Sequence, residues 1–116
     1  LESIGLAGGE KIYATYCIAC HQKDGNGDNS RFPPLRGSDW VNGDPKRLIS
    51  VLLNGLNEMI TVNGQKYTGL MPKHRFLSDE DIAQVLTYIR QNMSNSSSPI
   101  TAAEVHEERK KIPDNK

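Results

Sequence analysis

The 116-residue sequence has no excess of either charge and no long apolar run. Fourteen basic and fourteen acidic residues cancel to a formal net charge of +0. This balance argues against a general nucleic-acid-binding protein and against a protein held at a membrane surface by charge. No stretch of eighteen apolar residues exists, so no transmembrane helix is predicted. The chain starts at Leu1 without a charged and apolar leader, which suggests a processed or excised chain.

Large apolar side chains are also scarce. Hydrophobic residues make up 36% of the chain, and the aromatic ones are one Trp, four Tyr and two Phe. The length fits a single domain. A bulky apolar cofactor would supply surface around which such a chain could pack. The composition therefore agrees with a domain that folds around a cofactor.

The sequence has only two cysteines, and both belong to one C-x-x-C-H motif formed by Cys17, Cys20 and His21. On one turn of helix, two thiols at this spacing can add to the vinyl groups of a porphyrin. The histidine that follows then directs its imidazole at the iron from the same side. The motif predicts one covalently attached c-type haem per chain.

A C-x-x-C pair also occurs in dithiol redox proteins, in zinc sites and as a local disulfide. A thioredoxin-like motif follows a buried strand, whereas residues 10–16 approach the cysteines with a helical pattern and no βαβ unit is visible. A structural zinc site usually needs four ligands, and outside the motif only His74 and His106 are available histidines. Haem attachment is the preferred interpretation, with a zinc site and a redox dithiol kept as alternatives.

Four helices are predicted from apolar periodicity and capping signals, over residues 10–20, 45–54, 79–93 and 102–111. In the first, Ile12, Tyr16 and Ala19 share one face. Asp44 and Ser78 are the expected N-caps of the second and third helices. Thr101 with Glu104 predicts a capping box for the last. Residues 22–43, rich in turn-forming residue types, are expected to form an irregular loop.

A β-hairpin and a polar linker interrupt the helical pattern. Alternation over residues 58–68 around Asn63 and Gly64 predicts a short hairpin with a type I′ turn. Residues 94–99 are predicted to form a flexible link. The expected organisation is a main domain in residues 1–93, followed by a polar linker and a peripheral C-terminal helix in residues 94–116.

An electron-carrying haem needs a second axial ligand from a distant segment. The candidates are Met59, Met71, Met93, His74 and His106. Met71 is favoured, because Gly69 allows a close backbone approach and Pro72 places the thioether on a defined loop. His74 is the main rival, and bis-histidine ligation would lower the reduction potential.

Together these motifs resemble the class I (monohaem) c-type cytochromes, in particular small bacterial cytochrome c domains, from about residue 8 to residue 93. The matching segments, in order, are Gly9-x-x-x-Tyr13-x-x-x-Cys17-x-x-Cys20-His21, Pro33-Pro34-Leu35-Arg36-Gly37, Gly69-Leu70-Met71-Pro72 and Leu77-Ser78-Asp79-Glu80-Asp81-Ile82-x-x-Val85-x-x-Tyr88-Ile89. The resemblance implies an all-α cytochrome c fold of about four to five helices around one covalent haem, with the β-hairpin as an insertion.

The same resemblance implies roles for individual residues. Cys17 and Cys20 would form the thioether bonds, with His21 as proximal and Met71 as distal iron ligand. A backbone carbonyl near Pro33 would accept a hydrogen bond from the His21 ring. Further haem-pocket residues implied are Leu35, Arg36, Trp40 and Tyr67, of which the last three would line the haem or hydrogen-bond its propionates. The first helix and the last core helix would cross closely at Gly9 and Tyr88.

The implied function is one-electron transfer between redox proteins, without catalysis by the chain itself. The chain would be a soluble carrier or the electron-delivery domain of a larger enzyme, such as a terminal oxidase, nitrite reductase or dehydrogenase. A periplasmic or otherwise exported location is implied, because bacteria attach haem c outside the cytoplasm. The alternative from another class is a haem enzyme or gas-binding sensor with an open or His-ligated distal position, where His74 or Arg75 would act on the bound molecule.

Overall fold

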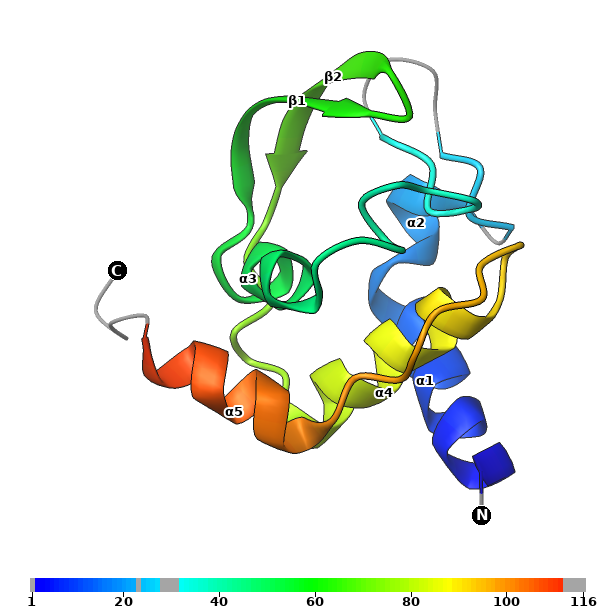
Figure 1. Ribbon diagram of the computed structural model, residues 1–116, viewed down its shortest axis with the longest axis vertical. Helices are drawn as coiled ribbons and strands as arrows, with labels where there is room; N and C mark the ends of the chain where they lie inside the picture. The colour runs from blue at the N-terminus through cyan, green and yellow to red at the C-terminus, as the bar shows by residue number, and fades with distance from the viewer. Residues whose placement is uncertain (1, 23, 28–31, 112–116) are drawn as a thin grey trace.

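The computed structural model describes residues 2–22, 24–27 and 32–111. Its elements, in chain order, are α1 (Glu2–Tyr16), α2 (Ile18–His21), α3 (Pro45–Asn54), β1 (Leu56–Val62), β2 (Gln65–Met71), α4 (Asp79–Gln91) and α5 (Ala102–Lys110). Figure 1 shows α1 and α4 crossing at one end, the hairpin at the other, and α3 between the hairpin and α5. This mainly helical architecture with one β-hairpin is consistent with a cytochrome c fold.

The first predicted helix is longer than expected and is broken at Cys17. α1 begins at Glu2 instead of residue 10, and Cys17 leaves helical geometry with a φ of −117° before α2 starts. The backbone N–H of Cys17 still donates to Tyr13 O at 2.9 Å, so α2 follows α1 directly. Tyr13 is 2% exposed and Tyr16 is 44% exposed. Tyr13 is therefore the tyrosine of α1 that packs in the core, and Tyr16 lies at the surface.

α1 and α4 approach each other closely at Gly9. A Cβ atom on Gly9 would lie 2.3 Å from Gln84 O and 2.7 Å from Tyr88 Cβ, which no real side chain tolerates. Beyond this point the rings of Tyr13 and Tyr88 pack with centroids 5.9 Å apart. The close crossing at Gly9 and Tyr88 is confirmed, and it sets where α1 delivers the C-x-x-C-H motif.

α3 has the bounds that its sequence predicts. Asp44 accepts a hydrogen bond from Lys46 N at 2.9 Å and caps the first turn, which contains Pro45. Gly55 has a φ of 73° and ends the helix. The buried residues of α3 are Leu48, Ile49, Leu52 and Leu53.

α4 begins at the predicted cap, where Ser78 Oγ accepts from Asp81 N at 3.1 Å. It ends at Gln91 and not at Met93, because Met93 and Ser94 adopt φ angles of 56° and 63° that an α-helix cannot accommodate. Its buried residues are Ile82, Ala83, Val85, Leu86, Ile89 and Arg90. The predicted apolar stripe faces the core, and one arginine is buried beside it.

The hairpin is longer than residues 58–68. Antiparallel pairing extends from the turn back to Leu56 opposite Met71. Asn63 and Gly64 have φ angles of 52° and 82°, as the predicted type I′ turn requires. Met71 is therefore the last residue of β2 and not part of a free loop, because its partner strand begins directly after α3.

The C-terminal segment is not peripheral. Val105 is 0% exposed, and Ile100 is buried in the same core cluster as the helices. In the predicted linker, Asn95 Nδ2 donates to Leu35 O at 3.0 Å and to Ile89 O at 2.9 Å. A few buried side chains within a polar sequence anchor this segment, so the description of residues 94–116 as linker and peripheral helix is wrong for the residues that the structure describes.

α5 is anchored at both ends. It begins with the predicted capping box, in which Thr101 Oγ1 accepts from Glu104 N and Glu104 Oε1 accepts from Thr101 N. In its last turn, Arg109 Nη1 donates to Arg75 O at 3.0 Å and Nη2 donates to Leu77 O at 2.7 Å. α5 therefore holds the backbone that leads into α4.

Val105→Ala tests whether α5 belongs to the core. Removing two buried methyl groups should lower the free energy of unfolding by about 2 kcal/mol. Denaturant unfolding of the haem-loaded protein, followed by circular dichroism, measures this change. Glu107→Ala on the exposed face of the same helix is the control and should stay within about 0.5 kcal/mol. Equal effects of the two substitutions would show that α5 is dispensable for the core.

Candidate functional site

A cavity of about 80 Å³ lies where α2, α3, α4 and the hairpin converge. Its walls are almost entirely apolar and include Cys17, His21, Leu35, Trp40, Met71 and Leu86. A second cavity of about 50 Å³ has Cys20, His21, Pro33 and Met71 in its wall. Both cavities lie beside the C-x-x-C-H motif and are lined mainly by apolar side chains, as the binding site of an apolar cofactor is.

His21 is oriented by the chain in a way that leaves one ring nitrogen available. Its Nδ1–H donates to Pro33 O at 3.0 Å, which is the contact that the resemblance implies. Nε2 is then the nitrogen that can coordinate a metal. Burial lowers the pKa of His21; the Pro33 hydrogen bond opposes this effect, and His74 adds to it. The imidazole is held neutral, which is the form that binds iron.

Cys17 lies directly after α1 and Cys20 lies in α2, and the two cysteines are not joined by a disulfide bond. Burial, with a smaller effect of Cys20, raises the pKa of Cys17 to about 11. A redox dithiol motif has a lowered thiol pKa and follows a strand, and neither holds here. Within the described ranges, no three His, Cys, Asp or Glu side chains are grouped to hold a metal ion. Neither alternative to haem attachment has support in the structure.

Met71 reaches both cavities from the end of β2. Its backbone pairs with Leu56 and packs against Gly55, where a Cβ atom would lie only 2.4 Å from Met71 O. Because Gly55 has a φ of 73° and no side chain, the hairpin can return this close to the end of α3. The glycine and the strand pairing together place Met71 in the cavity wall.

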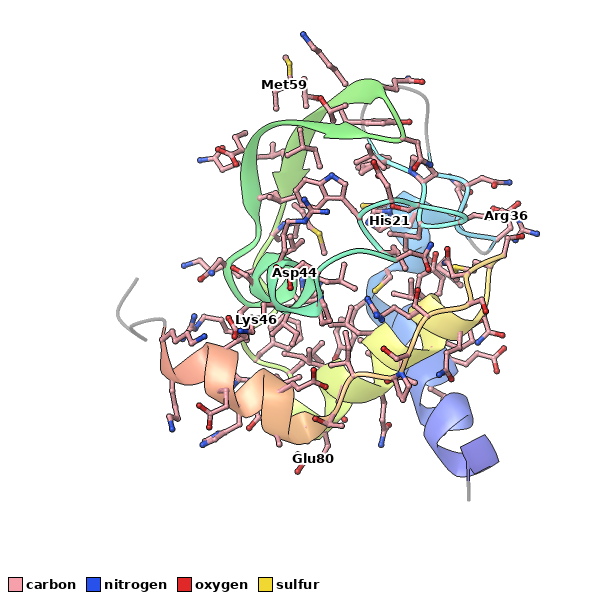
Figure 2. All side chains as sticks on the ribbon, in the orientation of Figure 1. His21, Arg36, Asp44, Lys46, Met59 and Glu80 are labelled. Carbon is pink, nitrogen blue, oxygen red and sulfur yellow. The ribbon has the colours of Figure 1, made fainter. Side chains whose placement is uncertain are left out.

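The other candidate ligands are held elsewhere. His74 is buried but is absent from both cavity walls, since its Nδ1–H donates to Pro72 O at 2.9 Å and its backbone N–H donates to Leu52 O at 2.7 Å. Met59 is 61% exposed and lies at the outer edge of the hairpin in Figure 2. Met93 and His106 are likewise outside both walls. Met71 is the one methionine of the described chain that shares the cavities with His21.

Comparison with known proteins agrees with this geometry. The cytochrome c family model matches residues 6–93, the stretch that contributes every cavity-lining residue named above. The chain belongs to the cytochrome c family. The resemblance to class I c-type cytochromes is confirmed. The protein is an electron carrier with a c-type haem, and it is not an enzyme.

The relatives include cytochromes c-552 and cytochrome subunits of dehydrogenases. The chain is 40% identical over 118 residues to a cytochrome c-552 of Thermus thermophilus, covering 94% of this chain and 79% of that protein. It is 34% identical over 101 residues to the cytochrome c subunit of a quinone alcohol dehydrogenase from Gluconobacter oxydans, covering 85% of this chain and 21% of that subunit. A fructose dehydrogenase cytochrome subunit from Gluconobacter japonicus is 28% identical over 109 residues, covering 87% of this chain and 22% of that subunit.

Two of the haem-pocket residues implied by the resemblance lie outside the cavity of this cytochrome. Arg36 is exposed, and Figure 2 shows it at the edge of the molecule, well away from His21. Tyr67 is buried in a small cluster with Ile60 and Val62 of the hairpin. Leu35, Pro33 and Trp40 do line the main cavity.

Trp40 is fixed by contacts that the sequence did not reveal. Its indole Nε1–H donates to Thr61 O at 2.8 Å, so this donor is not available to a haem propionate. The guanidinium of Arg47 stacks 3.9 Å from the centre of the Trp40 ring. Trp40 therefore serves as a wall of the cytochrome cavity and as a link to the hairpin.

Asn63 and Asp39 are joined by two backbone-to-side-chain hydrogen bonds. Asp39 N donates to Asn63 Oδ1 at 2.9 Å, and Asn63 N donates to Asp39 Oδ1 at 3.0 Å. This reciprocal pair joins the hairpin turn to the segment that carries Trp40. The turn signal at Asn63 was recognised in the sequence, but nothing local indicated the partner of its side chain.

Asn95 and Gly25 hold the loop that contributes Pro33 and Leu35. Gly25 O accepts from Leu35 N at 2.7 Å and from Arg36 N at 3.0 Å, while Asn95 donates to Leu35 O at 3.0 Å. Hydrogen bonds to Gly25 and from Asn95 therefore fix this loop, which was expected to be irregular. Because the acceptor of the His21 hydrogen bond belongs to this loop, these contacts also orient the His21 ring.

Proposed function

We propose that the chain carries one electron on a single haem c, attached through Cys17 and Cys20, with His21 and Met71 as axial ligands. The observation that carries the proposal is that His21 and Met71, from opposite parts of the sequence, share the walls of the same two cavities. Both ligand types suit a low-spin haem that exchanges electrons without binding a substrate.

The residues present fit a haem. The cavity offers an apolar lining for the porphyrin, a thiol at Cys17 in its wall, and a neutral imidazole with one free nitrogen. Bound haem would supply an iron that alternates between the Fe(III) and Fe(II) states. The chain orients the ligands and excludes water, so that little rearrangement accompanies the change of charge. The soft thioether of Met71 would favour the reduced state more than a second imidazole would.

The partners we propose are redox proteins, as electron donor and acceptor. Some relatives are named as cytochrome subunits of quinone-dependent dehydrogenases, and the chain spans about one fifth of their length. This supports either a soluble carrier or a haem domain that serves a dehydrogenase, terminal oxidase or nitrite reductase. No helix among the described residues is long and apolar enough to cross a membrane. Bacterial c-type cytochromes are typically exported, and we propose a periplasmic location.

Replacing both cysteines tests the mode of attachment. Haem should stay with the unaltered polypeptide after acidified-acetone extraction and migrate with it in a denaturing gel. The Cys17→Ala/Cys20→Ala double variant should release nearly all of its haem, because no other cysteine exists in the chain. Met59→Ala is the matched control and should retain haem. Release of haem from the unaltered protein would contradict covalent attachment.

A further inference from the structure

Arg90 is a buried cation directly behind the cavity wall. It lies on α4 and is 3% exposed. Its guanidinium donates from Nη1 to Val41 O at 2.8 Å and to Gly43 O at 3.2 Å, and from Nε to Ser98 O at 2.9 Å. A longer contact of 3.5 Å joins Nη2 to Ser98 Oγ. Each nitrogen of this guanidinium thus has a hydrogen-bond acceptor.

All of these acceptors are neutral. Throughout the part of the chain that the structure describes, no carboxylate lies within 4.0 Å of the Arg90 guanidinium. Arg109 is different, since its Nε lies 2.8 Å from Asp79 Oδ1. A guanidinium keeps its proton even when buried. Arg90 therefore places a full positive charge inside the domain with hydrogen bonds but without a counter-ion among the described residues.

This charge is separated from the cavity by a single residue. Val41 and Ile89 both line the cavity; Val41 accepts a hydrogen bond from Arg90, and Ile89 precedes Arg90 on α4. Val41 itself is buried, so no solvent lies between the charge and the cavity at this point. Charges in such an environment interact more strongly than in water and are screened little by salt.

We propose that Arg90 raises the reduction potential of the haem iron through its charge. The inference rests on the proposed function, because it requires haem in the cavity. Oxidised haem carries one more positive charge than reduced haem, and the electron added on reduction comes from the redox partner. A fixed cation nearby disfavours the oxidised state, so its removal should favour Fe(III) and lower the potential.

Potentiometric titration of haem-loaded variants separates charge from hydrogen bonding. Arg90→Met removes the charge but keeps a side chain of similar length. Arg90→Lys keeps the charge but loses the planar guanidinium group and its set of N–H donors. We expect a lower potential in Arg90→Met and a potential near that of the unaltered protein in Arg90→Lys, although both variants lose stability. Arg90→Gln is a second neutral variant that retains a donor for one carbonyl, and it should behave like Arg90→Met.

Lys46→Met provides the exposed control. Lys46 lies on α3 at the surface, as Figure 2 shows. Its replacement removes one positive charge, as Arg90→Met does. Its effect should be small and should disappear at high salt, whereas the Arg90→Met shift should persist. Equal downward shifts in Arg90→Lys and Arg90→Met, or no Arg90 shift beyond that of Lys46→Met, would overturn the inference. Absence of a haem c spectrum in the unaltered protein would instead contradict the proposed function.

Discussion

Replacing Met71 with alanine is expected to abolish the weak long-wavelength absorption band that reports methionine sulfur on ferric haem. The Met71 side chain lies in both cavity walls with His21, and no other methionine of the described chain does so. Without the thioether, the iron should lose its second axial ligand and show a high-spin spectrum. The reduction potential should fall, because thioether ligation stabilises the ferrous state. Absorption spectra of the oxidised and reduced variant measure both the ligation and the spin state.

Met59→Ala and His74→Ala are the controls for this experiment. Met59 is exposed on the hairpin, and His74 is held by Pro72 and Leu52 away from the cavities, so both variants should keep the band. A low-spin unaltered protein without the band, in which His74→Ala and not Met71→Ala changes the spectrum, would identify His74 as the distal ligand.

Carbon monoxide distinguishes the carrier from the alternative of a haem enzyme or gas sensor. The reduced unaltered protein should bind carbon monoxide slowly or not at all, because Met71 occupies the distal position in our proposal. Reduced Met71→Ala should bind it rapidly. Rapid binding by the unaltered protein, together with a high-spin spectrum, would contradict His/Met ligation and favour an open distal site.

Gly9→Val is expected to have the largest effect on stability, a loss of at least about 3 kcal/mol in the free energy of unfolding. Even the first atom of the new side chain would lie 2.3 Å from Gln84 O, which is backbone and cannot rotate away. α1 would have to move off α4, separating the rings of Tyr13 and Tyr88. Guanidinium chloride unfolding, followed by circular dichroism and by haem absorbance, measures the loss.

Ala14→Val is the matched control on the same helix. Ala14 is exposed, and a β-branched residue in a helix should cost only about 0.5 kcal/mol there. Because the C-x-x-C-H motif directly follows α1, the Gly9 variant should also weaken the methionine band before the protein unfolds. Comparable small losses in the two variants would show that α1 and α4 can separate without cost.

Features with local signals were predicted well from the sequence. The bounds of α3 follow from the Asp44 cap, Pro45 at the first position and Gly55 at the end. The type I′ turn follows from Asn63 and Gly64, which tolerate positive φ. In each case the determining residues are neighbours in the chain, so the physical reason is visible without knowing the fold.

Long-range contacts were not predictable in the same way. Asn95 looked like part of a flexible serine-rich link, yet its side chain joins Leu35 to the end of α4. Arg90 lies near the end of an amphipathic helix, where a charged residue is usually exposed, yet segments around residues 41–43 and 98 bury it. Hydrogen-bonding side chains have many possible partners in a sequence, and only the packed backbone selects among them.

The sequence by itself indicated the kind of cofactor and predicted its attachment point, because Cys17, Cys20 and His21 lie within one turn and their spacing alone matches haem c. Only the tertiary structure decided which distal candidate reaches the cavity. Met71 and His74 are close in the chain, but pairing of β2 with β1 places Met71 in the cavity wall. The carbonyl groups of Leu52 and Pro72 hold His74 away from it.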